Sequence, residues 1–325
     1  MKLYRQGAVW ALALCAAFPF CGTLVHAQPY PTKPVRLIVG FAPGGTADIV
    51  ARIVGPKLSE VWGKSVIVDN RPGAGSTLGA ELAAKASPDG HTLLFVSSSY
   101  AASAGLYKNL GYDPVKSFNA VSLVATTPQV MLANPAVPAK TLSEVLALAK
   151  ASPGKFNYGS AGEGSTTHLA GELLGSMTGI KMIHVPYKGG APALVDTIAG
   201  SIQYMFFTIP GALQYVKSGR VRAIGVTSLK RHADLPEVQT FAETLPGYEA
   251  TNWYAMLAPA GVPDFVVKRI HAGIVEVLKE PSVAKSIVSA GADPQGGTPE
   301  EMAGYLKSEI AKWTKVIKEA NLVVK

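Results

Sequence analysis

The sequence is almost free of cysteine. Its only two cysteines, Cys15 and Cys21, lie in the first 27 residues, a segment that we expect to be removed on export. The remaining chain would contain no disulfide, no thiolate nucleophile and no cysteine-ligated metal. Its stability must therefore come from a hydrophobic core, and a chain of roughly 300 residues can bury a sizeable one.

The first 27 residues have the pattern of a cleavable signal peptide. Lys2 and Arg5 precede an apolar run from Ala8 to Phe20, and Val25-His26-Ala27 matches the site that a signal peptidase cuts. A membrane anchor is the alternative, but Pro19 interrupts the run, which is shorter than the roughly 20 apolar residues of a spanning helix. No small residue precedes either cysteine, which argues against lipidation. We expect cleavage after Ala27.

Charge of one sign is not concentrated anywhere in the sequence. The sequence has 30 basic residues, Lys2 and Arg5 among them, and 22 acidic residues. No long run of like charge occurs. Nucleic-acid-binding proteins typically show a basic stripe, so we expect no nucleic-acid partner. A mildly positive protein favours anionic solutes.

Signatures of nucleotide binding and hydrolysis are missing. The spacing of Gly40, Gly45 and Thr46 is similar to that of a phosphate loop but lacks its lysine, and Leu78 replaces the third glycine of a dinucleotide fingerprint. The sequence contains no Gly-x-Ser-x-Gly elbow, and its histidines lack metal-ligand spacing. We expect no metal or cofactor. A hydrolase would need a Ser/His/acid set that only folding assembles, and this alternative stays open.

Strand and helix patterns alternate along most of the chain. This alternation predicts an α/β protein with parallel sheets and helices on both of their faces. Pro56 lies inside one predicted helix and is expected to kink it. The predicted strands are 35–41, 66–68, 91–96, 157–159, 181–185, 202–207 and 221–226, and the predicted helices are 46–62, 77–85, 141–151, 165–177, 191–199, 212–217, 263–279, 282–289 and 298–320.

The length of the chain suggests two domains. The last three predicted helices have no strands of their own, so we expect the chain to return to its first domain after building the second. Apolar extended stretches at 121–133 and 251–258 are the expected crossings. The prediction assigns 28–124 and 251–325 to domain 1 and 125–250 to domain 2, as two doubly wound lobes joined by a two-strand hinge.

Three glycine-rich loops, at 41–48, 70–77 and 158–168, each follow a predicted strand and precede a predicted helix. The first N–H groups of a helix point outward, its dipole adds partial positive charge, and glycine lets an anion approach the backbone. In open α/β sheets, ligands bind beyond the carboxyl ends of the strands. Such turns often only connect elements, but three in one chain favour a binding site for a small carboxylate.

Together these loops resemble a known family. The segments 30–34, 39–48, 68–75, 158–169 and 185–190 are similar, in order and across almost the whole chain after residue 27, to the Bug-type extracytoplasmic receptors of the tripartite tricarboxylate transporter family. The resemblance implies a type II periplasmic-binding-protein-like clamshell that is not an enzyme. It also implies a periplasmic protein that delivers a carboxylate to membrane permease subunits, and a monomer is the default expectation for a clamshell. A secreted hydrolase and a ligand-presenting sensor are the alternatives.

The resemblance further implies how the ligand is held. In such receptors the loop after the first strand and the Gly/Ser loop of the second domain grip carboxylates through backbone N–H groups, hydroxyls and ordered waters. The known ligand classes are tricarboxylates, dicarboxylates, acidic amino acids and aromatic carboxylates. Ser98 and Thr208 follow predicted strands and are added for their hydroxyls. The expected ligand-binding residues are Ala42, Pro43, Gly44, Gly45, Thr46, Asp48, Ser98, Ser160, Ala161, Gly164, Ser165, Thr166, His168 and Thr208.

Several of these residues have a second interpretation. Thr46 is equally well placed to cap its helix. Asp48 would repel a carboxylate, so we expect it to bond loop amides or a ligand amino group. His168 also fits a buried structural histidine. Four further residues could contact the ligand but fit loop or hinge packing at least as well, and their role is left open: Arg71, Tyr100, Trp253 and Tyr254.

Overall fold

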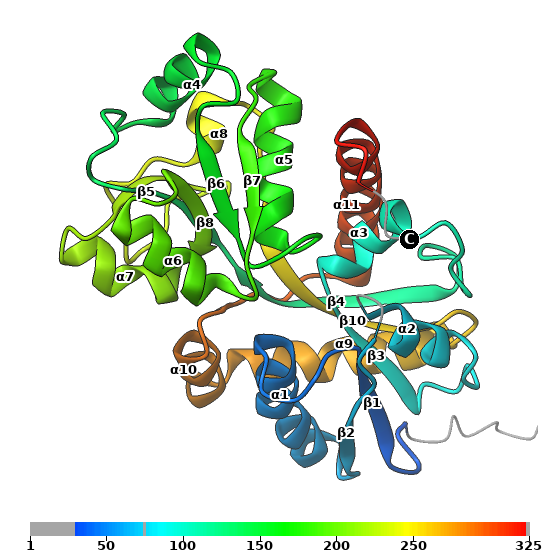
Figure 1. Ribbon diagram of the computed structural model, residues 1–325. Helices are drawn as coiled ribbons and strands as arrows, with labels where there is room; N and C mark the ends of the chain where they lie inside the picture. Colours follow the sequence, from blue (N-terminus) through cyan, green and yellow to red (C-terminus); the bar gives the residue numbers. More distant parts are fainter. Residues whose placement is uncertain (1–29, 74–75, 323–325) are drawn as a thin grey trace, which may run out of the picture.

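The computed structural model describes residues 30–73 and 76–322. The predicted signal peptide and its cleavage site lie outside these residues. The described chain forms two β-sheets with helices on both faces of each (Figure 1). One buried cluster reaches from the first sheet into the second, and a separate cluster lies on the far face of each. The two-domain α/β clamshell predicted from the sequence is therefore the architecture of the protein.

The first sheet collects strands from both ends of the chain. Strand β1, which lies between β3 and β2, is almost wholly buried, as its apolar sequence predicts. In spatial order the strands are β11 (Asp293–Pro294), β4 (Phe118–Thr127), β10 (Asn252–Pro259), β3 (Thr92–Ser97), β1 (Val35–Val39) and β2 (Val66–Asn70).

The second sheet is built from the middle of the chain. In spatial order its strands are β7 (Ile183–Pro186), β6 (Asn157–Ser160), β8 (Tyr204–Thr208), β5 (Gln129–Ala133) and β9 (Arg222–Val226).

The predicted helices are present, with ends shifted by a few residues. Helix α3 was not predicted because its small and apolar residues are buried on most sides and show no amphipathic pattern. Helix α1 contains Pro56 without ending there, and the kink stays a prediction. The helices are α1 (Thr46–Trp62), α2 (Thr77–Ala84), α3 (Ser99–Leu106), α4 (Leu142–Ala151), α5 (Thr166–Thr178), α6 (Gly190–Ala199), α7 (Ile209–Lys217), α8 (Phe241–Thr244), α9 (Asp264–Lys279), α10 (Pro281–Ser289) and α11 (Pro299–Glu319).

None of the helices in the described ranges is long and apolar enough to cross a membrane.

The expectation of purely parallel sheets is wrong for the strands that connect the two domains. Strands β1, β2 and β3 are parallel, as are β6, β7 and β8. However, β10 runs antiparallel to β3 and β4, and β5 runs antiparallel to β8 and β9. Both strands come from the other domain and enter their sheet at the C-terminal ends of the parallel strands. They must therefore run in the opposite direction to those strands. The domain boundaries in residue numbers stay a prediction.

The C-terminal helix α11 is fixed to the returning strand β10 by a buried carboxylate. Glu309 is 2% exposed. Its Oε2 accepts the indole N–H of Trp253 at 2.8 Å and that of Trp313 at 2.9 Å, and Lys312 forms an ion pair with the same side chain. Trp253 is wholly buried, so it packs in the hinge and has no surface for a ligand.

Replacing Glu309 by alanine should destabilise the protein strongly. Both indole N–H groups would then be buried without their acceptor, and each such group costs about 1–3 kcal/mol. We expect a loss of about 3 kcal/mol in the free energy of unfolding by urea denaturation. The control is Glu300→Ala, an exposed glutamate in the first turn of the same helix, with an expected loss below about 1 kcal/mol. Equal losses in the two variants would contradict this account of the hinge.

Candidate functional site

The first glycine-rich loop joins β1 to α1 and leaves the start of that helix without a side-chain cap. The N-cap residue is Gly45, with φ −80° and ψ 163°, and no side chain bonds to the first turn. Thr46 is the first helical residue, so the interpretation of Thr46 as the helix cap is wrong. Residues 42–45 are exposed. The first N–H groups of α1, together with its dipole, therefore form a place where an anion is favoured.

Asp48 lies under this loop and holds it. The side chain is 3% exposed. One carboxylate oxygen accepts the N–H of Gly44 at 2.9 Å, and the other accepts Arg52 Nε at 2.9 Å and Asn70 Nδ2 at 2.8 Å. Burial by itself raises the pKa of Asp48, but these donors outweigh it and hold the pKa below its usual value. Asp48 thus bonds a loop amide, one of the two roles expected for it.

The arginines around the first loop are engaged by acidic or amide partners. Arg52 donates to both Asp48 and Asn70. Arg71, which follows β2, forms an ion pair with Asp69 at 3.0 Å, and Arg36 binds the same carboxylate. Arg71 therefore holds its loop to β2. The exposed residues 42–45 of the first loop themselves offer only neutral backbone donors.

A network of hydroxyls connects the first loop to the hinge. Ser98, 2% exposed, donates to Asn252 Oδ1 at 2.5 Å, and Asn252 Nδ2 donates to the Tyr254 hydroxyl at 2.7 Å. The Tyr254 hydroxyl also lies against the hydroxyls of Thr46 and Thr127, and burial raises its pKa. The structure therefore brings two predicted site residues, Ser98 and Thr46, together through Asn252. Sequence analysis missed Asn252, because an asparagine at a strand start carries no signal of its own.

The Gly/Ser loop of the second domain is stabilised by its own hydrogen bonds. Ser165 is the N-cap of α5 and accepts the N–H of His168 at 3.2 Å. Its hydroxyl donates to the carbonyl of Gly162 at 2.7 Å, and the amide of Ala161 donates to Thr167 Oγ1 at 2.9 Å. Unlike α1, α5 is capped by its own sequence. The neighbouring loop after β7 packs against it, with Gly189 donating to the carbonyl of Ala161.

Two stacked histidines lie beneath this loop. The rings of His168 and His184 are 3.7 Å apart and nearly parallel. His168 is 2% exposed, and its Nδ1 accepts the N–H of Gly164 at 3.0 Å. His184 Nε2 lies 2.6 Å from the hydroxyl of Ser160, which is wholly buried. Burial, and then the neighbouring His168, lowers the pKa of His184 to about 4. His168 is thus a buried histidine that organises the loop.

The Ser160–His184 pair does not form an accessible nucleophile. A hydrolase needs a serine that reaches its substrate and an acid that orients the histidine. Ser160 has no exposed surface, and its hydroxyl is bonded to both the N–H and the carbonyl of Gly162. Glu172, the acid beside the pair, contacts His168. Across the described part of the chain, no group of three or more potential metal ligands occurs.

Two further predicted residues are half-buried, and Tyr100, whose role was left open, is a core residue. Thr208 is the N-cap of α7 but does not cap it with its side chain, and it is half-buried opposite Gln129. Thr166, the first residue of α5, is also half-buried. Tyr100, by contrast, is wholly buried, and its hydroxyl donates to the carbonyl of Pro114. It is a core residue, not an aromatic wall for a ligand.

The loops of the two domains adjoin. A Cβ atom at Gly164 would lie 3.6 Å from Leu106, in helix α3 of the first domain. Helix α3 begins directly after Ser98. The Gly/Ser loop of the second domain therefore lies against the C-terminal end of α3 in the first domain.

The lowered pKa of His184 predicts a loss of stability in acid. The unfolded chain binds a proton near pH 6.5, whereas the folded protein binds it only near pH 4. The contribution of His184 to stability is therefore complete above pH 6.5 and is lost as the pH falls toward 4, by up to about 3 kcal/mol before solvent screening. Urea denaturation between pH 7 and 4 should show a shallower decline for His184→Gln than for the parent protein. Identical pH profiles would contradict the assignment.

Comparison with known proteins identifies the family. Residues 50–322 match the family described as the tripartite tricarboxylate transporter family receptor. The solved structure of R. palustris Rpa4515 with adipate is 34% identical, with a TM-score of 0.72 and coverage of 90% of this chain and 98% of that one. MatC from Rhodopseudomonas palustris, with bound malate, is 31% identical, with a TM-score of 0.69 and coverage of 89% and 100%.

The periplasmic binding protein BugD is similar as well, at 33% identity and a TM-score of 0.69, with 90% of this chain and 99% of that chain covered. These matches confirm the resemblance to Bug-type receptors that the loop motifs predicted. The protein belongs to the tripartite tricarboxylate transporter receptor family.

Proposed function

We propose that this protein captures a small dicarboxylate between its two domains and delivers it to the permease of a tripartite tricarboxylate transporter. The observation that carries the proposal is the start of α1. Its N-cap is a glycine, no side chain caps the first turn, and Asp48 fixes the preceding loop through Gly44. A carboxylate placed there would accept the N–H groups that the sequence leaves without a cap.

The ligand class follows from the donors that the loops offer. The exposed residues of the first loop offer neutral backbone donors, and the nearby arginines are paired with acidic side chains, which suits a carboxylate better than a polyphosphate. Adipate in one relative and malate in another support a dicarboxylate. The second carboxylate would reach the Gly/Ser loop between Ala161 and Ser165.

The predicted site residues take two roles in this proposal. Exposed and half-buried positions of the loops contact the ligand, and buried ones support the loops from beneath. The first group is Ala42, Pro43, Gly44, Gly45, Thr46, Ala161, Gly164, Ser165, Thr166 and Thr208, and the second is Asp48, Ser98, Ser160 and His168. The buried state of Ser160 also supports binding over hydrolysis. We further propose cleavage after Ala27 and a freely diffusing periplasmic monomer.

A thermal-shift panel should reveal the ligand. The panel contains dicarboxylates of increasing length, tricarboxylates, acidic amino acids and aromatic acids, each paired with its monoamide as a control. A ligand at 100 times its dissociation constant stabilises the protein by about 2.7 kcal/mol. We expect at least one dicarboxylate to raise the melting temperature and its monoamide to do so less. A panel without any shift would contradict the carboxylate assignment.

Replacing Gly45 by aspartate should separate stability from binding. The backbone at Gly45 suits any residue, and an added Cβ would meet only the carbonyl of Ala42 at 3.9 Å. An aspartate N-cap should make the protein about 1 kcal/mol more stable than Gly45→Ala, because its carboxylate accepts first-turn N–H groups. For the same reason it should displace the ligand and weaken binding roughly tenfold or more.

Two control variants complete the test. Gly45→Asn places a neutral cap in the same position and should weaken binding less than Gly45→Asp, because it does not repel the ligand. Gly45→Ala adds the side-chain carbon without an acceptor and should bind nearly as well as the parent. Calorimetric titration with the dicarboxylate from the panel measures these affinities. Unchanged affinity in Gly45→Asp would show that the ligand does not use the start of α1.

A further inference from the structure

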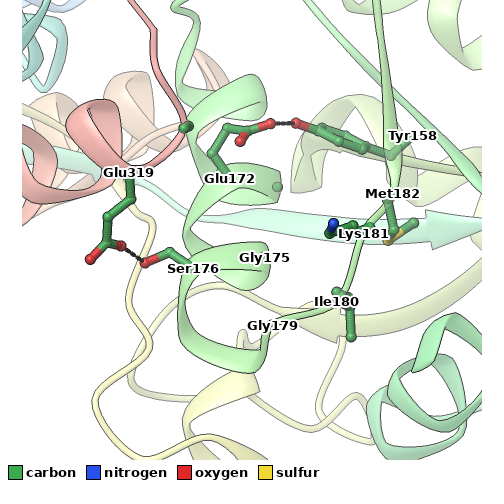
Figure 2. A pocket seen from close by; sticks show the side chains of 11 residues that line it. Tyr158, Glu172, Gly175, Ser176, Gly179, Ile180, Lys181, Met182 and Glu319 are labelled. Carbon is green, nitrogen blue, oxygen red and sulfur yellow. Dashed lines mark hydrogen bonds between the residues drawn. The ribbon is translucent and has the colours of Figure 1, made fainter. Parts of the chain in front are cut away.

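Helix α5 carries a chain of polar contacts that begins at the Gly/Ser loop and reaches a pocket beside the helix. At the loop end, the N–H of Gly164 donates to His168 Nδ1 at 3.0 Å. Four residues further along the helix, Glu172 Oε1 lies 3.4 Å from His168 Nε2. The hydroxyl of Tyr158, from β6, donates to the same oxygen at 2.5 Å. Figure 2 shows the Glu172 carboxylate and the Tyr158 hydroxyl directed at one another.

The contact at Gly164 restricts where the imidazole carries its hydrogen. A neutral imidazole has one N–H group and one acceptor nitrogen. Because Nδ1 accepts the amide hydrogen of Gly164, the ring hydrogen must be on Nε2. A hydrogen on Nδ1 would face the N–H of Gly164 and push this part of the loop away. The shape of the loop therefore depends on one tautomer of His168.

Glu172 supplies the acceptor that favours this tautomer. Its Oε1 faces Nε2, and a hydrogen-bond acceptor beside one ring nitrogen holds the hydrogen there. Burial by itself raises the pKa of Glu172, but the hydrogen bonds from His168 and Tyr158 outweigh it and keep the pKa below its usual value. The carboxylate is thus ionised at neutral pH and accepts from both donors.

The neighbourhood is shaped to hold this arrangement. Gly171 lies against the ring of Tyr158, and a Cβ atom there would come within 2.3 Å of Cε2. Any larger residue would move the tyrosine away from Glu172. Glu172 and Tyr158 both line a pocket of about 470 Å³ together with Ser176, Lys181 and Glu319 (Figure 2). This pocket leaves space for the amide group of a glutamine at position 172.

We propose that Glu172 is a positioning residue for ligand binding: by holding the ring hydrogen of His168 on Nε2, it keeps Nδ1 available for Gly164 and so fixes the Gly/Ser loop. The inference rests on the proposed function, in which this loop binds one end of a dicarboxylate. Glu172 itself does not touch the ligand in this account. It acts through His168, which is part of the Gly/Ser loop motif at 158–169.

Two substitutions distinguish a hydrogen-bond acceptor from a mere filler of space. Glu172→Leu removes the acceptor, whereas Glu172→Gln retains an oxygen that accepts from His168 and Tyr158. The first readout is the pair of ring ¹⁵N chemical shifts of His168, assigned by comparison with His168→Asn, which report the tautomer without any ligand. We expect the Nε2–H form in the parent and in Glu172→Gln, and loss of its dominance in Glu172→Leu.

The second readout is affinity for the dicarboxylate found in the thermal-shift panel. Glu172→Leu should bind it roughly tenfold more weakly than the parent, and Glu172→Gln within about threefold of the parent. The control is Glu319→Leu, which lines the same pocket and bonds Ser176 but has no contact with His168. It should change neither the tautomer nor the affinity.

The outcomes are separable from those of the proposed function. An Nδ1–H tautomer in the parent protein would overturn the inference whether or not a ligand is found. It would also be overturned if Glu172→Leu retained both the Nε2–H form and the parent affinity, or if Glu172→Gln lost as much as Glu172→Leu. A panel without any ligand would instead contradict the proposed function, and the ¹⁵N shifts would still test the role of Glu172.

Discussion

The hydrogen bond from the amide of Gly44 to Asp48 is the interaction on which the candidate site depends. A carboxylate one turn into α1 would ordinarily compete with a ligand for the positive end of the helix dipole. Here it is buried and directed backward, where Gly44, Arg52 and Asn70 use its lone pairs. The loop is fixed while the first N–H groups of α1 are left without a side-chain cap. This is why we propose that a carboxylate of the ligand binds at the start of α1.

The two domains prepare their loops differently. In the first domain the helix start is open, and the loop is held from beneath by an acid. In the second domain Ser165 caps α5, and the loop is held by His168 through Gly164. Both arrangements hold the loop backbone by a hydrogen bond to a buried polar side chain. A site of this kind needs little reorganisation when a ligand arrives, which preserves binding free energy.

Much of the fold could be predicted from the sequence because its signals are local. The period of the apolar residues gave α1 and most strands, and the loop motifs gave the family. The antiparallel direction of β5 and β10 could not be predicted, because it depends on whether the chain enters the sheet at the N-terminal or the C-terminal ends of the parallel strands. Helix α3 was missed because burial on most sides removes the helical pattern. Asn252 was missed because its two partners, Ser98 and Tyr254, meet only in the folded hinge.

The ligand contacts of the candidate site stay a prediction, but the structure already separates exposed from buried residues in the predicted loops. Ser160 and His168 belong to the predicted loop, but both are buried beneath it, and sequence position alone does not tell a supporting residue from one that contacts the ligand. The most direct test of the central claim is a crystal structure with a bound dicarboxylate. We predict a carboxylate oxygen within about 3 Å of the backbone nitrogen of Thr46 or Ala47. A ligand bound between the domains without contact to the start of α1 would contradict it.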